Sequence, residues 1–174
     1  DINLIDSFNK GDNFGVFQME RSKMFIDSFR SSGGVPDSFE DIVAINAMNR
    51  PGPLEKYIKK YGYWKAIDKG KVEITEEELK IVDAERYPFP FMKEILGSTY
   101  GAVLYQEQIM KLVCELTGMS FGESDVFRRS IAWTKDHPKF YTVKTLFDNV
   151  RESMYRKGFS ESDADFFFQY LKDV

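Results

Sequence analysis

Residues 105–131 read YQEQIMKLVCELTGMSFGESDVFRRSI and contain the clearest secondary-structure signal of the chain. In the first half of this stretch, apolar residues recur at the three- and four-residue spacing of one helix face. These residues are Ile109, Leu112, Val113 and Leu116. Gly118 follows at the position where helices often end with a left-handed residue. The pattern therefore predicts a helix over residues 105–117.

The second half of the stretch opens with a helix start signal. Ser120 and Glu123 have the spacing of a capping box, in which each side chain bonds a free backbone N–H of the first turn. We therefore predict a second helix that continues to about Ile131. On this helix Phe127 and Ile131 are four residues apart and share an apolar face.

Helical periodicity also covers much of the remaining chain. We expect helices over residues 19–30, over residues 139–157 and from Ser160 to the C-terminus. Asp37 and Glu40 predict a capping box that opens one more helix. The core face of that helix would consist of Phe39, Ile42, Val43 and Ile45.

Prolines and glycines separate these helices. Residues 50–53, RPGP, end one helix, because a proline disfavours helical dihedrals in the residue before it. Thr75 and Glu78 indicate a short acidic helix, but we expect the proline-containing segment around 59–92 to be irregular. Residues 101–104, GAVL, resemble a strand and are too short to anchor a sheet. The fold class is therefore mainly α, a multi-helix domain with little or no sheet.

Composition excludes several classes of protein. The 174 residues carry 24 Lys and Arg against 28 Asp and Glu, and 43% of them are hydrophobic, which is a globular composition. A single cysteine, Cys114, cannot form an internal disulfide, and a single histidine, His137, excludes sites built from several histidines. No apolar run is long enough to cross a bilayer. We expect a cytoplasmic protein and, because the chain starts at Asp1 without a methionine and stops within a helical pattern, a piece of a longer one.

Charge is distributed unevenly along the chain. Residues 73–94 contain three basic and seven acidic side chains, whereas residues 128–157 contain eight basic and three acidic ones. An acidic chain with one basic segment argues against bulk binding of nucleic acid and allows a local phosphate site. The alternative to a phosphate site is that these charged side chains simply form a solvent-exposed helix face.

Arg128 and Arg129 are the candidate residues of such a site. At about 100° per residue, Arg129 points away from the apolar face of its helix and Arg128 lies on the flank of that face. Guanidinium groups bind phosphate oxygens bidentately and keep their charge. Lys135 and Lys139 could add further positive charge. The alternative is an ordinary exposed pair of arginines.

Two other places present polar groups that could bind a nucleotide. Arg50 precedes a stiff Pro-Gly-Pro turn, which would present its side chain with little loss of entropy. Tyr105, Gln106 and Gln108 open a predicted helix with a ring and two amides, which could stack on a base and bond its edge. The alternative for Arg50 is an exposed arginine at the end of a helix. The alternative for Tyr105, Gln106 and Gln108 is that they are ordinary polar residues of a first helical turn.

The sequence contains no catalytic set that we can identify. Two-metal phosphoryl transfer needs two or three carboxylates around metal ions about 4 Å apart. Asp125 and Glu123 share a helix, but Glu123 belongs to a capping box. The acidic residues 76–78 complement the dipole of a helix N-terminus. We therefore expect no metal site in this chain.

Five short motifs occur in a characteristic order along the chain. They are GVFQME at 15–20, DSFEDI at 37–42, RPGP at 50–53, TYGAVLYQEQ at 99–108 and FRR at 127–129. Together they resemble the fingers region of the bacterial replicative DNA polymerase III alpha subunit, a family C DNA polymerase. The resemblance runs from about Asp6 to the C-terminus. It departs at residues 130–135, SIAWTK, where most relatives have a glycine and several lysines, and this indicates a divergent or phage-encoded member.

The resemblance implies a single helical fingers domain over residues 1–174, without the palm and C-terminal parts of the polymerase. In this family the aspartates that bind Mg²⁺ belong to the palm, so this fragment alone would be inactive. The resemblance implies that Arg128 and Arg129 contact the triphosphate of the incoming deoxynucleotide and that Arg50 belongs to the same nucleotide-binding site. Closure of the fingers would bring the arginine pair to the phosphates.

The same resemblance assigns roles to five further residues. Tyr105, Gln106 and Gln108 would line the pocket of the nascent base pair and template, and Lys135 and Lys139 would contact the DNA backbone. The partners would be primer-template DNA, a deoxynucleoside triphosphate and the remaining polymerase domains, with no membrane.

The residues alone leave a second class of function open. A non-catalytic helical module that binds a partner protein through an aromatic surface fits the charge and the missing catalytic set equally well. A third possibility is that exposed aromatics such as Phe89, Phe91 and Phe166 mark only surfaces that the rest of a polymerase covers.

Overall fold

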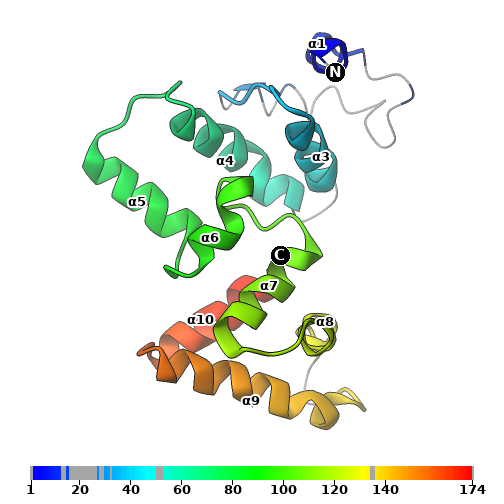
Figure 1. Ribbon diagram of the computed structural model, residues 1–174, viewed down its shortest axis with the longest axis vertical. Coiled ribbons are helices and arrows are strands. Elements are labelled where there is room, and N and C mark those ends of the chain that lie inside the picture. Colours follow the sequence, from blue (N-terminus) through cyan, green and yellow to red (C-terminus); the bar gives the residue numbers. More distant parts are fainter. Residues whose placement is uncertain are drawn as a thin grey trace. The chain divides into compact units, whose positions relative to one another are not determined.

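The computed structural model describes residues 2–12, 15, 27, 30–31, 33–49, 53–133 and 136–173. Contacts divide the chain into two compact units, Asp1–Leu104 and Tyr105–Val174. Within the described ranges the regular elements are helices and none is a strand (Figure 1). The predicted mainly α class is therefore confirmed.

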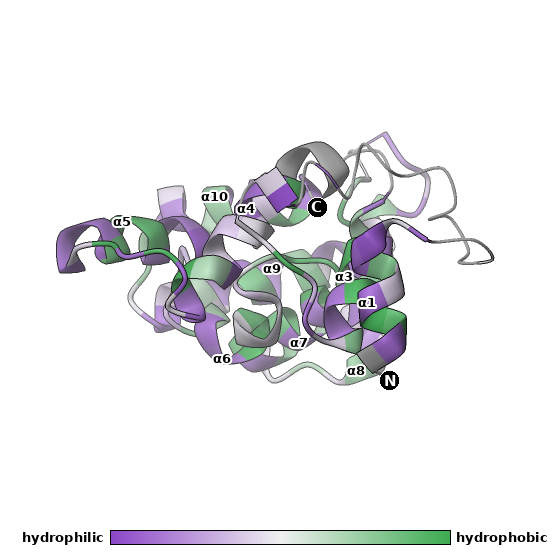
Figure 2. Cartoon of the chain, turned by 90° about the horizontal axis from the view of Figure 1, so that it is seen from above, coloured by the Kyte–Doolittle hydropathy of each residue, from purple (hydrophilic) through white to green (hydrophobic). Residues whose placement is uncertain are grey.

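The first unit contains α1 (Ile2–Lys10), α3 (Phe39–Met48), α4 (Pro53–Asp68), α5 (Glu76–Arg86), α6 (Met92–Leu96) and the 3-10 helix η1 (Gly97–Thr99). The second unit contains α7 (Gln106–Thr117), α8 (Phe121–Ser130), α9 (Phe140–Arg156) and α10 (Glu161–Lys172). Helices such as α1 and α5 carry both hydrophobic and hydrophilic residues (Figure 2). The helix predicted over residues 19–30 lies outside the described residues, apart from two positions.

In the first unit, α4 packs on α3 and buries a face rich in aromatic rings. Tyr57, Tyr61 and Trp64 recur at helix spacing and are at most 3% exposed. Lys65 is also buried, and its Nζ donates to Asp41 Oδ2 at 2.6 Å and to Asp37 Oδ1 at 2.8 Å. The structure tolerates this buried ammonium group because carboxylates compensate its charge.

The prediction that the segment around 59–92 is irregular was wrong. Helix α4 occupies its first part and α5 its middle, and only the connections at 69–75 and 87–91 are non-helical. The short acidic helix predicted from Thr75 and Glu78 is confirmed, because these residues form the capping box of α5. The helical signal of α4 is hard to detect because tyrosine, tryptophan and a lysine occupy positions where aliphatic residues usually stand. Pro88 and Pro90 do lie in the second connection, where their missing N–H groups do no harm.

The start of α3 also differs from the prediction. Ser38 and Asp41 form its capping box, one residue later than the predicted pair Asp37 and Glu40. Asp37 instead pairs with Lys65, a partner 28 residues away that a local pattern cannot reveal.

The predicted apolar face of α3 was only partly right. Ile42 and Ile45 are buried, whereas Phe39 is 58% and Val43 40% exposed. Phe89, which we expected at the surface, is 3% exposed.

The turn after η1 makes a close backbone contact with α5. Tyr100 and Gly101 both have positive φ angles, 53° and 96°. A Cβ atom on Gly101 would collide with Cβ of Arg86, so glycine is required at this position. Arg86 is 4% exposed and forms ion pairs with Asp68 and Asp83.

The helices of the second unit begin and end close to the predicted residues. Gly118 ends α7 with a φ of 74°, and Gly158 follows α9 with a φ of 87°. Ser120 caps α8 and Ser160 caps α10, each in a capping box. Helices α7, α8 and α9 pack against one another, and α10 packs on α9. The fully buried side chains of this core include Leu112, Val113, Phe127, Val150, Met154 and Phe167.

Candidate functional site

Helix α8 of the second unit carries the candidate arginine pair and is anchored at both ends. Ser120 Oγ accepts the N–H of Glu123, while the Glu123 carboxylate accepts the N–H and O–H of Ser120. These hydrogen bonds lower the pKa of Glu123, so its negative charge complements the dipole at the helix N-terminus. At the other end, Phe127 is 0% exposed and fixes the helix in the core.

Arg128 and Arg129 project from this anchored helix toward solvent. The side chain of Arg128 is 20% exposed and that of Arg129 is 60% exposed. Both guanidinium groups contact one carboxylate: Arg128 Nη2 lies 3.0 Å from Asp125 Oδ1, and Arg129 Nη2 lies 2.7 Å from Asp125 Oδ2. We call Asp125, Arg128 and Arg129 the arginine fork.

The ion pairs of the arginine fork are weak enough for a ligand to displace. Asp125 and the arginines are three and four residues apart on one helix and partly or largely exposed. Such pairs contribute only about 0.2–0.5 kcal/mol each. An anion with more negative charge can therefore take the place of the carboxylate at little cost. The fork is chemically suited to bind a phosphate group, because its two guanidiniums converge on one anion.

The structure also describes four of the other predicted site residues. Gln106 is exposed, whereas Gln108 is 6% exposed, and its Oε1 accepts the backbone N–H of Tyr105 at 3.0 Å. Gln108 thus helps to fix the start of α7, and Tyr105 itself is half-buried. Lys139 is exposed just before α9. Arg50 and Lys135 lie outside the described residues.

The described part of the chain contains neither a cluster of metal-binding side chains nor a helix that could span a membrane. Among those residues, no group of three or more His, Cys, Asp or Glu side chains could hold a metal ion. None of the helices described is both long and apolar enough to span a membrane.

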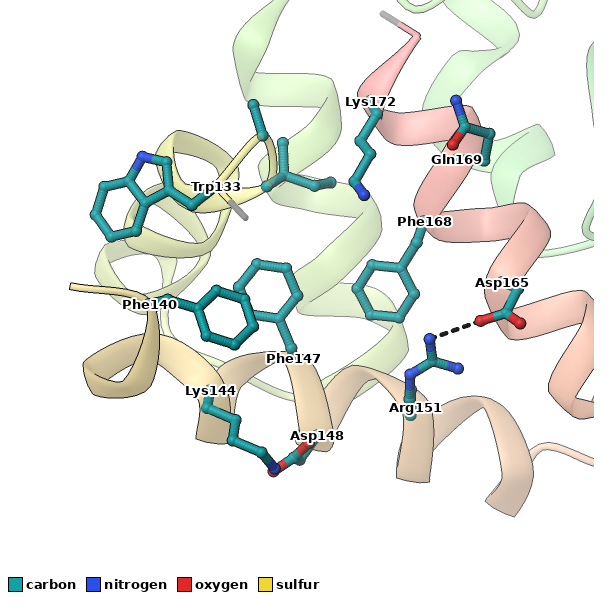
Figure 3. A pocket seen from close by; sticks show the side chains of 12 residues that line it. Trp133, Phe140, Lys144, Phe147, Asp148, Arg151, Asp165, Phe168, Gln169 and Lys172 are labelled. Carbon is teal, nitrogen blue, oxygen red and sulfur yellow. Dashed lines mark hydrogen bonds and ion pairs between the residues drawn. The ribbon is translucent and has the colours of Figure 1, made fainter. Parts of the chain in front are cut away.

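Sequence reasoning missed one feature of the second unit, which we call the aromatic groove. It has a volume of about 780 Å³ and is lined by residues of α9, α10 and the segment that follows α8 (Figure 3). The lining residues are Ile131, Ala132, Trp133, Phe140, Lys144, Phe147, Asp148, Arg151, Asp165, Phe168, Gln169 and Lys172. The seven-residue spacing of Phe140 and Phe147 is a signal that could have indicated one aromatic face on α9.

The family match and the relatives described below all name the same polymerase subunit. Residues 1–158 match the family described as the bacterial DNA polymerase III alpha subunit finger domain. The DNA polymerase III subunit alpha of Halalkalibacterium halodurans is 40% identical over 134 residues, which are 72% of this chain and 10% of the relative. The subunits of the same name from Campylobacter jejuni and Borreliella burgdorferi are each 31% identical, over 95% and 99% of this chain and over 12% and 13% of their own lengths.

The chain thus spans about a tenth of the length of these curated relatives. The family match nevertheless covers most of the 174 residues. This chain therefore belongs to the bacterial DNA polymerase III alpha subunit finger domain family.

Proposed function

We propose that this chain is the nucleotide-binding fingers part of a DNA-directed DNA polymerase that acts in DNA replication. In this proposal Arg128 and Arg129 bind the triphosphate of the incoming deoxynucleotide. The observation that carries the proposal is the convergence of both guanidinium groups on the Asp125 carboxylate. A polyphosphate presents several anionic oxygens to the same two forks, and preorganised cations of this kind stabilise the charge that builds up during nucleotidyl transfer.

The relatives support the polymerase context. Those reported above are named DNA polymerase III subunit alpha, a DNA-synthesising enzyme, and they are much longer than this chain. Because the described residues contain no carboxylate cluster for a metal ion, they do not fit a Mg²⁺ site. We propose that palm aspartates elsewhere in the polymerase bind Mg²⁺ and supply the metal-dependent chemistry. The 174 residues alone should then show no primer extension with magnesium.

The remaining site residues would act on the base pair and the DNA. The exposed amide of Gln106 is free of the cap that holds Gln108, so Gln106 is the better placed of the two to meet a base edge. The ring of Tyr105 could stack on a base. Gln108 would hold Tyr105 in place, because its side-chain oxygen accepts the backbone N–H of Tyr105. Lys139, being exposed, could contact a backbone phosphate. Arg50 and Lys135 remain proposed contacts of the nucleotide and the DNA backbone.

The partners in this proposal are primer-template DNA, a deoxynucleoside triphosphate and the other domains of the polymerase. No membrane takes part, and the place of action would be the cytoplasm of a bacterial or phage-infected cell. Docking of a partner protein is a second function, which the aromatic groove favours and which does not depend on the arginine fork.

The proposal is tested by steady-state primer extension with the full-length polymerase that contains this chain. Arg129→Ala removes charge-assisted hydrogen bonds worth about 1.5–3 kcal/mol, so we expect kcat/KM for deoxynucleotides to fall roughly 10- to 150-fold. Arg128→Ala should act in the same direction. Arg156→Ala, at an exposed arginine in the last turn of α9, is the matched control and should change little. Equal values of kcat/KM in all four proteins would reject the triphosphate assignment.

A further inference from the structure

The aromatic groove of the second unit is large and has an apolar floor. The rings of Phe140, Phe147 and Phe168 lie along it (Figure 3). Phe147 and Phe168 are stacked with centroids 5.7 Å apart, and Phe140 lies 6.1 Å from Phe147. Phe140 and Phe147 are only half-buried, so apolar ring surface remains accessible to solvent. A concave apolar site of about 780 Å³ is within the range of sites that bind ligands or apolar side chains.

The segment that follows α8 lines one side of the groove. Trp133 and His137 stack there with ring centroids 3.9 Å apart, and Trp133 is half-buried. Ala132 lies beside Trp133 and is exposed, which leaves this side of the groove open to a ligand.

The charges of the rim favour one kind of occupant. Lys144 pairs with Asp148 along α9, and Arg151 of α9 pairs with Asp165 of α10 at 2.6 Å (Figure 3). These four charges are compensated. Lys172 is exposed, extends toward the groove in Figure 3 and has no ion pair among the described residues. Within the part of the chain that the structure describes, the rim therefore offers one positive charge without an ion-pair partner.

A nucleic acid would fit this rim poorly. Lys144 and Arg151 are already paired with carboxylates, so the phosphates of a nucleic acid would find at this rim only Lys172 as a cation without an ion-pair partner among the described residues. A protein segment with apolar side chains and one suitably placed carboxylate matches both the floor and the rim.

The length of the groove suits a short helix. From Phe140 to Arg151, α9 rises about 16 Å at about 1.5 Å per residue, which corresponds to three turns of a second helix laid beside it. Helices that dock in grooves insert apolar side chains at three- and four-residue spacing.

We propose that the aromatic groove is a docking site for an amphipathic helix of a partner protein. The helix would insert apolar side chains over Phe140, Phe147 and Phe168 and set a carboxylate against Lys172. This proposal does not rest on the arginine fork, so either one can fail without the other.

The test selects peptides on the 174-residue chain from a displayed random library of about 15 residues, roughly four helical turns. The chain has two tryptophans, Trp64 and Trp133, so Trp64→Phe leaves Trp133 as the only tryptophan fluorophore. A synthetic copy of the most enriched peptide is then titrated while the fluorescence of Trp133 is recorded. Circular dichroism of each variant checks that its helices are retained.

We expect the enriched peptides to share two apolar residues three or four positions apart and an Asp or Glu. Ala132→Phe, which fills the open side of the groove without adding a second tryptophan, should weaken binding at least about tenfold. Lys172→Glu should weaken it about fivefold, and a Lys in place of the acidic residue of the peptide should restore binding. Lys111→Glu, an exposed lysine of α7 away from the groove lining, is the matched charge control.

Four results would overturn the proposal. They are the absence of enrichment, enriched peptides without the apolar spacing, binding that Ala132→Phe leaves unchanged, and a preference for basic peptides in the unmodified chain. A single-stranded DNA oligonucleotide that shifts Trp133 fluorescence, with the shift lost in Ala132→Phe, would assign the groove to nucleic acid. Dimerisation abolished by Ala132→Phe, measured by sedimentation, would assign it to a second copy of the chain.

Discussion

Replacing Lys65 by methionine should destabilise the first unit strongly. Lys65 is 1% exposed, and its ammonium group donates to Asp37, to Asp41 and to the carbonyl oxygen of Val35 at 2.8 Å. Methionine fills a similar volume but leaves the carboxylate of Asp41, 2% exposed, without its counter-charge. Breaking a buried pair in this way costs about 3–5 kcal/mol. Because about 1 kcal/mol shifts Tm by about 2–4 °C in a chain of this size, Tm should fall by about 6–20 °C.

The assay is urea unfolding and thermal unfolding followed by circular dichroism, with Lys60→Met as the matched control. Lys60 lies on the same helix but is 46% exposed in its pair with Glu85, so its loss should cost at most about 1 kcal/mol. Adding Asp41→Asn to Lys65→Met should recover part of the loss, because a neutral amide needs no counter-charge. If Lys65→Met and Lys60→Met were equally stable, the buried pair would not have the structural role that we assign to it.

Three further predictions concern single positions. Gly101→Ala should lower the free energy of unfolding by about 1–3 kcal/mol, because residue 101 has a positive φ and the new Cβ would collide with Arg86. Gly122→Ala, in open space on α8, should raise the free energy of unfolding by about 0.5–1 kcal/mol. Equal urea midpoints for the two variants would contradict this prediction. Hydrogen bonds from Ser120 depress the pKa of Glu123 in the folded state, so the stabilisation is present above the unfolded pKa of about 4.5 and is lost as pH falls through the folded value. The Tm of Glu123→Gln should therefore fall less than the Tm of the unmodified chain when thermal scans are repeated from about pH 6 to about pH 3. Asp125→Asn should tighten the binding of inorganic triphosphate about two- to fivefold, because it removes a competing anion from the arginine fork. The affinity is measured by ³¹P NMR titration at low salt. Weaker binding would contradict this and show that Asp125 orients the arginines.

Local signals predicted the second unit well. The capping box of Ser120 and Glu123, the left-handed Gly118 and the apolar spacing of α7 depend on neighbours within a few residues. The outward direction of Arg129 follows from the burial of Phe127 two positions earlier, because a helix turns by about 100° per residue.

Features that depend on distant partners were not predictable in the same way. Asp37 had the spacing of a capping residue, but it pairs with Lys65, and Ser38 caps α3 in its place. The aromatic face of α4 concealed a helix, since its buried positions include a charged residue whose partners lie on α3 and just before it. The aromatic groove forms only when α9 and α10 pack together, and Arg151 and Asp165 pair across 14 positions of sequence.

The arginine fork is tested most directly by equilibrium binding of a deoxynucleotide to the full-length polymerase on a primer ended by a dideoxynucleotide, so that no bond can form. We expect the Arg128→Ala, Arg129→Ala double variant to bind the correct deoxynucleoside triphosphate at least about tenfold more weakly, since it loses charge-assisted hydrogen bonds to the phosphates. Its affinity for the primer-template itself should stay the same. An unchanged affinity for the triphosphate would contradict the proposed role of the fork.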